Sequence, residues 1–305
     1  MSVEKTAEDI RTMNIRGAGK IARSAADALR RLAASYQGRD LAAFRITMEE
    51  GKKVLLNSRP TAISLWNAVQ AVFRDTSSIT DVEEYRRKMV GNAETFIKRS
   101  SEAVDRIGQI GSKRIRGGER ILTHCNSSAA LSVIKTAHAE GKEVEVFATE
   151  SRPWRQGLLT VRDLSAAGVP ATLIIDSAVR WIMKDVDVVY VGADTICSNG
   201  AVINKIGTSQ IALIANEARV PFIVCAETYK FSPKTMFGEL VDIEERDPSE
   251  IASPDELPPG VKVRNPVFDA TPAEYVDSIV TEVGVISPYA AHDIIAKEFG
   301  LSHAF

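Results

Sequence analysis

Residues 121–148 read ILTHCNSSAALSVIKTAHAEGKEVEVFA, and this stretch decides the class of fold. Two short runs rich in β-branched residues, ILTH and VEVFA, enclose a segment with helical spacing that ends before Gly141. Short apolar strands joined by a helix are typical of a parallel sheet covered by helices on both faces. The stretch therefore predicts a strand, a crossover helix and a second, parallel strand.

The same alternation continues toward the C-terminus. Further strand-like runs are ATLII, VDVVYV and PFIVC, and crossover helices are expected near 157–167, 177–184 and 207–218. We therefore expect a Rossmann-like, doubly wound parallel sheet, an α/β fold, in residues 113–305. The tail adds an acidic stretch, VDIEERDPSEIASPDE, expected as an exposed loop, then a strand-like NPVFD and a final helix at 288–299.

The first 112 residues have a different pattern. Helical apolar spacing occurs in 20–35, 40–56 and 61–74 and in a long helix expected to begin near Thr80, whereas strand-like runs are almost absent. An all-α N-terminal domain over 1–112 is predicted. The basic, glycine-containing GSKRIRGG that follows, from Gly111 to Gly118, reads as a solvated linker between the two domains.

Composition excludes several classes of protein. The 305 residues include 38 basic and 40 acidic side chains, so no global field favours nucleic acid or an anionic membrane surface. The three cysteines and four histidines show no metal-ligand spacing, which argues against a metal site and against a disulfide framework. No apolar run is long enough to span a membrane, and the charged N-terminal stretch has no signal-peptide character. These features fit a reducing cytoplasm.

Two residues that follow strands are candidate catalytic groups, because ligands of open α/β sheets lie beyond the carboxyl ends of the strands. Cys125 ends ILTH and precedes a helix start, whose N–H groups and dipole favour a thiolate able to act at neutral pH. Asp194 follows VVYVG at the start of a long glycine-containing loop. The alternatives are a small buried cysteine and a turn-forming aspartate. His124 is expected to be structural, since adjacent strand residues point to opposite faces.

Several cations stand at the ends of expected elements. The segment Arg16-Gly17-Ala18-Gly19-Lys20 precedes a helix, Arg59 stands at another helix start, Asn204-Lys205 precede the helix at 207–218, and Lys230 follows PFIVC. Each taken alone reads as a solvated surface residue. Together they form a set able to clamp a doubly phosphorylated small molecule.

Six motifs resemble one superfamily: IRGAGKI, NSRPTAISL, THCNSSA, ESRPWRQG, VGADTICSNGAVINKIGTSQIAL and AETYKF. It contains methylthioribose-1-phosphate isomerases, archaeal ribose-1,5-bisphosphate isomerases and the regulatory subunits of the exchange factor for translation initiation. The resemblance covers nearly the whole chain and is strongest to the ribose-1,5-bisphosphate isomerases. The methylthioribose enzymes typically have Ala-Pro where this chain has Ala18-Gly19, and the regulatory subunits lack the residues that stand here as Cys125 and Asp194.

The resemblance implies conversion of α-D-ribose 1,5-bisphosphate to D-ribulose 1,5-bisphosphate during nucleotide breakdown, without a metal or organic cofactor. It assigns Cys125 as proton acceptor and Asp194 as proton donor. It also implies a set of substrate contacts: Arg16, Gly17, Ala18, Gly19, Arg59, Ser127, Ser128, Ala129, Asn204, Lys205 and Lys230.

The superfamily leaves two other functions open, a methylthioribose-1-phosphate isomerase and a non-catalytic regulatory subunit. The resemblance further implies a homo-oligomer, a dimer or a hexamer of dimers, and a response to AMP. Because the implied contacts are divided between 1–112 and 113–305, the sequence also predicts closure about the linker 111–118 when substrate binds.

Overall fold

The computed structural model describes residues 2–300 and divides the chain into two compact units, residues 1–103 and 104–305. The sequence places the division at 112/113. The boundary at 103/104 lies inside one helix, α5 (Val82–Gly111), and the boundary predicted from the sequence lies just after the end of that helix. Among residues 2–300 no helix is long and apolar enough to cross a membrane.

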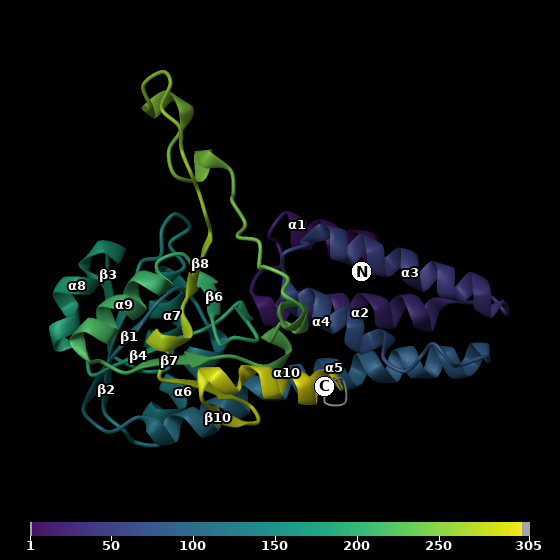
Figure 1. Ribbon diagram of the computed structural model, residues 1–305, viewed down its shortest axis with the longest axis horizontal. Coiled ribbons are helices and arrows are strands. Elements are labelled where there is room, and N and C mark those ends of the chain that lie inside the picture. Colours follow the sequence, from purple (N-terminus) through teal and green to yellow (C-terminus); the bar gives the residue numbers. More distant parts are fainter. Residues whose placement is uncertain (1, 301–305) are drawn as a thin grey trace. The chain divides into compact units, whose positions relative to one another are not determined.

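The helical unit packs amphipathic helices around a single apolar core (Figure 1). Small alanines along α2 allow close approach of its neighbours, and Phe44, Met48 and Leu65 fill the space between the helices with no exposed surface. Within this unit the helices besides α5 are α1 (Val3–Arg11), α2 (Ala18–Ser35), α3 (Leu41–Ser58) and α4 (Ile63–Phe73).

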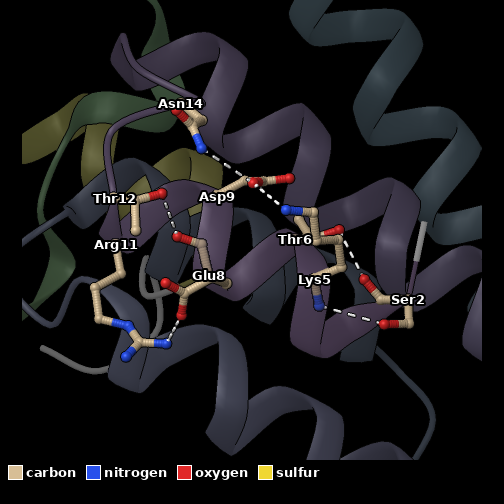
Figure 2. Close-up of polar contacts among 8 residues, drawn as sticks. All are labelled: Ser2, Lys5, Thr6, Glu8, Asp9, Arg11, Thr12 and Asn14. Carbon is tan, nitrogen blue, oxygen red and sulfur yellow. Dashed lines mark hydrogen bonds and ion pairs between the residues drawn. The ribbon is translucent and has the colours of Figure 1, made fainter.

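Helix α1 was not expected from the sequence, and local polar contacts account for it (Figure 2). The Ser2 hydroxyl accepts a hydrogen bond from the Lys5 backbone N–H at 3.2 Å and so caps the helix start. Lys5 pairs with Asp9 one turn later at 2.9 Å. Asp9 also accepts from the Asn14 side chain at 3.3 Å, which ties the turn after the helix back onto its last turns.

The long helix expected to begin near Thr80 is α5, which starts at Val82. Its first turn is capped by Asp81, whose carboxylate accepts from the Glu84 backbone N–H at 2.7 Å. The supposed linker begins as the last residue of the helix and continues into a 3₁₀ turn. Gly111, Ser112 and Ile115 are buried, whereas Lys113, Arg114 and residues 116–118 are exposed, so the segment is anchored at its helical end and solvated over most of the rest.

The second unit contains a seven-stranded sheet in the order β10-β9-β7-β4-β1-β2-β3. All neighbouring pairs are parallel except β10, which pairs antiparallel with β9 at one edge. The expected strands are confirmed, and β9 and β10 are additional. The strands are β1 (Glu119–Thr123), β2 (Val144–Thr149), β3 (Ala171–Ile174), β4 (Val188–Val191), β7 (Phe222–Cys225), β9 (Ser278–Thr281) and β10 (Gly284–Ile286).

Two apolar cores lie on the two faces of this sheet, as the doubly wound prediction requires. Ile121 belongs to one core and the next residue, Leu122, to the other, because side chains alternate across a strand. Residues of α6 and α7 contribute to one core and those of α8, α9 and α10 to the other. The bounds are α6 (Ser128–Ala139), α7 (Gly157–Ala166), α8 (Val179–Ile182), α9 (Thr208–Ala218) and α10 (Ala291–Phe299).

A small antiparallel sheet occupies much of the stretch that the sequence predicts as a long loop after Asp194. It contains β5 (Thr195–Ile196), β6 (Val202–Lys205) and β8 (Phe268–Thr271) in that order. The acidic stretch before β8 is mostly exposed and extends away from the sheet as an arm with short 3₁₀ turns (Figure 1), which confirms the loop prediction.

Candidate active site

The order of the main sheet defines where a ligand site is expected. The chain runs outward from β1 through β2 to β3 and then returns to β4, on the other side of β1. Strand order reverses between β1 and β4, and such a reversal opens a crevice at the carboxyl ends of the two strands. Cys125 follows β1 and Asp194 follows β4, so the structure places both candidate catalytic residues at this crevice.

Cys125 is half-buried and has an unusual backbone conformation, with φ of +65°. Its N–H donates to the Ser151 hydroxyl at 2.8 Å, and its carbonyl accepts from the Thr160 hydroxyl at 2.6 Å. These two hydroxyls were not predicted as site residues.

The electrostatics of the thiol differ from the sequence expectation. Burial raises the pKa of Cys125 to about 11, although the positive charge of Lys205 acts in the opposite direction. The negative charges of Asp194 and Asp176 raise this pKa further. The thiol is therefore mostly protonated at neutral pH, because its loss of contact with water outweighs the effect of the nearby helix start.

Asp194 lies at the junction of β4 with the small sheet. Its backbone N–H donates to the Ile203 carbonyl at 2.9 Å, and its side chain is partly exposed. The next residue enters β5, so the antiparallel pairing with β6 fixes the backbone on one side of the aspartate.

The start of α6 lies against the end of β4. Ser127 caps the helix, since its hydroxyl accepts from the Ala130 N–H at 3.3 Å. A Cβ added to Gly192 would stand 2.3 Å from the Ser127 Oγ, so only glycine permits this close approach. Ser127, Ser128 and Ala129 are thereby placed at the same crevice as the residues that follow β4.

Asn204 and Lys205 end β6 and are both buried. The Asn204 amide donates to the Thr208 hydroxyl at 3.0 Å, and the Lys205 ammonium lies 5.1 Å from the centre of the Phe268 ring. The start of α9 beyond them is already occupied, because the Asp269 carboxylate accepts from the Gly207 N–H at 2.7 Å. A carboxylate of the protein, rather than open backbone N–H groups, therefore caps that helix.

Lys230 follows β7 and is buried, so the alternative of a solvated surface lysine is wrong for this residue. Its ammonium lies 2.7 Å from Glu227 Oε2, while Glu227 Oε1 accepts from the Tyr229 hydroxyl at 2.9 Å. Burial alone would raise the pKa of Glu227, but the Lys230 charge and these hydrogen bonds hold it below its ordinary value.

His124 has the structural surroundings that the sequence predicts. It is 1% exposed, with Nδ1 2.6 Å from the Thr149 hydroxyl and Nε2 2.8 Å from the Ile206 carbonyl. Burial lowers its pKa, so the neutral ring donates from Nε2 and accepts at Nδ1.

The remaining predicted contacts belong to the helical unit. Gly17 caps α2 with φ of +88° and open space around its Cα, and Arg16 beside it is exposed. Arg59 is the residue at the end of α3 rather than the start of a helix, since α4 begins at Ile63. The assignment of Arg16–Gly19 and Arg59 to a substrate site stays a prediction.

The sequence profile of the Initiation factor 2 subunit family matches residues 14–288 of this chain. The chain belongs to the Initiation factor 2 subunit family. A protein of Archaeoglobus fulgidus named ribose 1,5-bisphosphate isomerase is 55% identical and aligns with 98% of this chain and 94% of its own length. One of the same name from Methanocaldococcus jannaschii is 51% identical over 98% of this chain and 96% of its own.

Other relatives of this chain carry different names. A methylthioribose-1-phosphate isomerase of Heliobacterium modesticaldum is 39% identical over 92% of this chain and 86% of its own length. The crystal structure of a Pyrococcus horikoshii OT3 protein named translation initiation factor eIF-2B superposes with a TM-score of 0.81 at 31% identity, covering 94% of this chain and 97% of that one. The names of the proteins similar to this chain therefore divide between enzymes and translation factors.

Within residues 2–300 no group of three or more histidine, cysteine, aspartate or glutamate side chains is arranged to hold a metal ion.

Three residues around Cys125 were not predicted from the sequence: Ser151, Thr160 and Asp176. Ser151 and Asp176 follow β2 and β3, so the rule that selected Cys125 and Asp194 would also have selected them. Thr160 lies inside α7, where only its contact with Cys125 reveals it.

Proposed function

We propose that this chain is an aldose–ketose isomerase that converts α-D-ribose 1,5-bisphosphate into D-ribulose 1,5-bisphosphate. The observation that carries the proposal is the placement of Cys125 and Asp194 at the carboxyl ends of β1 and β4, on the two sides of the switch point. The names of relatives at 40–55% identity support the choice of substrate.

The residue types suit the chemistry. A sugar phosphorylated on C1 has no free anomeric hydroxyl, so its ring opens only if the ring oxygen is protonated. Asp194 donates that proton, and the Cys125 thiolate removes the proton from C2. The bond between C1 and the ring oxygen breaks, and the enol that results keeps its phosphate on the C1 oxygen. The Cys125 thiol returns its proton to C1, and the C2 hydroxyl gives its proton back to Asp194 as the ketone forms.

Electrostatics of the site set a condition on this mechanism. Because burial keeps Cys125 mostly protonated in the free protein, the reactive form is a minor thiolate fraction. Lys205 increases that fraction, since its charge lowers the pKa of the thiol. Lys205 therefore has two roles in this proposal, as a phosphate contact and as a partner of the thiolate.

The two phosphates of the substrate require cationic and backbone N–H contacts. We assign these to the residues already predicted from the sequence, of which the buried Lys205 and Lys230 are the most strongly constrained. The full set is Arg16, Gly17, Ala18, Gly19, Arg59, Ser127, Ser128, Ala129, Asn204, Lys205 and Lys230.

One assay tests the function. The purified chain is incubated separately with ribose 1,5-bisphosphate and with methylthioribose 1-phosphate, and the ketose product is detected by NMR. Turnover of the bisphosphate alone supports the proposal, turnover of the thioether substrate alone makes the chain a methylthioribose-1-phosphate isomerase, and turnover of neither points to a regulatory role. Cys125→Ser and Asp194→Asn should each lower kcat at least ~10²-fold.

We further propose that the enzyme works in nucleotide breakdown in the cytoplasm, as a homo-oligomer that responds to AMP. The support for these points is the resemblance of the chain to its superfamily. Light scattering measures the oligomer, and kcat measured with and without AMP tests the response. A monomer, or rates that AMP leaves unchanged, would contradict the corresponding point.

A further inference from the structure

The backbone of Cys125 is in a conformation that cysteine rarely adopts. A φ of +65° brings Cβ close to the carbonyl oxygen and costs about 1–2 kcal/mol for a residue other than glycine. Asparagine and aspartate tolerate this region through local hydrogen bonds, but cysteine has no such group. Tertiary contacts must therefore hold the residue in place.

Two buried hydroxyls make those contacts, one on each side of the residue. The Cys125 N–H donates to Ser151 Oγ at 2.8 Å, and the Thr160 Oγ1 hydroxyl donates to the Cys125 carbonyl at 2.6 Å. Ser151 and Thr160 have no exposed surface, so water does not compete for either bond. Both polar groups of the Cys125 backbone are satisfied by side chains from the β2–α7 region.

Ser151 is itself held rigidly. Its backbone is also left-handed, with φ of +59°, and its N–H donates to Asp176 Oδ1 at 2.8 Å. Its hydroxyl lies 3.3 Å from both Thr149 Oγ1 and His124 Nδ1. Ser151 is thus fixed by side chains at the carboxyl ends of three neighbouring strands, β1, β2 and β3: His124 and Thr149 contact its hydroxyl, and Asp176 binds its backbone N–H.

Thr160 is fixed by the packing of α7. A Cβ added to Gly157, at the start of this helix, would lie 1.9 Å from the Thr149 carbonyl oxygen, so the helix start contacts the end of β2 directly. Thr160 is three residues further along, and its hydroxyl also accepts from the Asn126 amide at 3.1 Å. The hydroxyl therefore bonds two consecutive residues, Cys125 and Asn126.

We propose that Ser151 and Thr160 are positioning residues, which clamp the backbone of Cys125 in its left-handed conformation and thereby aim the thiol at the switch-point crevice. The catalytic part of this inference rests on the proposed isomerase function. The geometric part is independent of the isomerase function, because it concerns only the orientation of the thiol.

The test removes one clamp with little change of shape. Thr160→Val deletes the hydroxyl, and Thr160→Ser restores it. Thr281→Val is the matched control, because Thr281 is equally buried and also donates to a backbone carbonyl, that of Gly284 at 2.8 Å, at another place in the same unit. For each variant, kcat and KM for ribose 1,5-bisphosphate are measured, together with the rate of Cys125 alkylation by iodoacetamide, followed on its peptide by mass spectrometry.

Thr160→Val is expected to lower kcat about 10- to 100-fold with KM changed less than threefold, and Thr160→Ser to recover most of the loss. Alkylation of Cys125 should be at least threefold faster in Thr160→Val, because the freed backbone exposes the thiol. Thr281→Val should resemble the wild type in both readouts. Equal kcat and equal alkylation in Thr160→Val and Thr281→Val would overturn the proposal.

The two measurements also separate this inference from the function. If the wild type does not convert the bisphosphate, the isomerase proposal fails, while the alkylation rates still test the clamp. If conversion is normal and Thr160→Val changes neither rate, the clamp fails and the function stands. Ser151→Ala provides a second test of the clamp, with the same expected acceleration of alkylation.

Discussion

Lys230 Nζ lies 2.7 Å from Glu227 Oε2, and both side chains are almost completely buried. The lysine that the sequence assigns to a phosphate is therefore already paired with a carboxylate of the protein. A phosphate that binds Lys230 has to share its ammonium with Glu227. The positive charge of Lys230 also keeps the buried Glu227 carboxylate ionised, because it holds the pKa of that carboxyl below its ordinary value.

Separating this pair should destabilise the fold. Glu227→Gln leaves the buried ammonium without its counter-charge, and we expect a loss of about 3 kcal/mol in the free energy of unfolding. Lys230→Met should cost a similar amount, and the double variant less than the sum of the two. Urea denaturation measures all three. Glu102→Gln, in an exposed pair with Lys98 at 4.0 Å, is the control and should change stability by less than about 0.5 kcal/mol. Strictly additive losses would rule out the coupling.

The reactivity of Cys125 should depend on pH in one direction. Since the pKa of the thiol is raised to about 11, its thiolate is a minor species throughout the neutral range. The rate of alkylation by iodoacetamide should rise about tenfold per pH unit between pH 7.5 and 9.5. Lys205→Met should make the reaction slower at each pH, because the lysine charge lowers this pKa. A rate that levels off near pH 9 would show a thiol with the ordinary pKa of 9.0, and one that levels off at lower pH would show an activated thiol.

The left-handed backbone at position 125 predicts an unusual order of stability. Cys125→Gly should be more stable than Cys125→Ala by about 1 kcal/mol, since glycine adopts positive φ without strain. Thermal unfolding measures the difference. At Cys197, which is buried and has an ordinary φ, the order should be reversed, with alanine more stable than glycine. If alanine were more stable than glycine at both positions, Cys125 would be unstrained.

Asp269 should make stability depend on pH near neutrality. Burial raises its pKa to about 6, even though it accepts N–H bonds from Gly207 and Ser209 at the start of α9. Between the ordinary value of 3.8 and about 6 the folded protein binds a proton that the unfolded chain does not. The contribution of this group therefore increases as pH falls and is lost as pH rises through 6.

The corresponding measurement compares the wild type with Asp269→Asn at pH 4.5 and 7.5. The wild type should gain about 1–2 kcal/mol relative to the variant at the lower pH, and other carboxylates cancel in the difference. A difference that does not change with pH would mean that Asp269 titrates alike in the folded and unfolded chains.

Much of the α/β unit follows from local pattern. ILTH, VEVFA, VDVVYV and PFIVC correspond to central strands, because a strand buried on both faces needs a continuous apolar run whatever its partners are. ATLII corresponds to the edge strand β3, of which only Ile174 is buried. The short strands β5, β6, β9 and β10 were missed. They have two to four residues each, too few for a period-2 pattern to stand out, and pairing with other segments is what makes them strands.

For the candidate site, too, local sequence predicts some features and tertiary packing sets the others. The position of Cys125 and Asp194 at the switch point follows from local sequence, since both come after strands whose order obeys the rules of doubly wound sheets. The chemical state of the site residues depends on contacts between distant segments. The bonds that hold Cys125 come from Ser151 and Thr160, which lie 26 and 35 residues away along the chain. The raised pKa of its thiol and the pairing of Lys230 arise from burial, which depends on how the whole chain packs around each group.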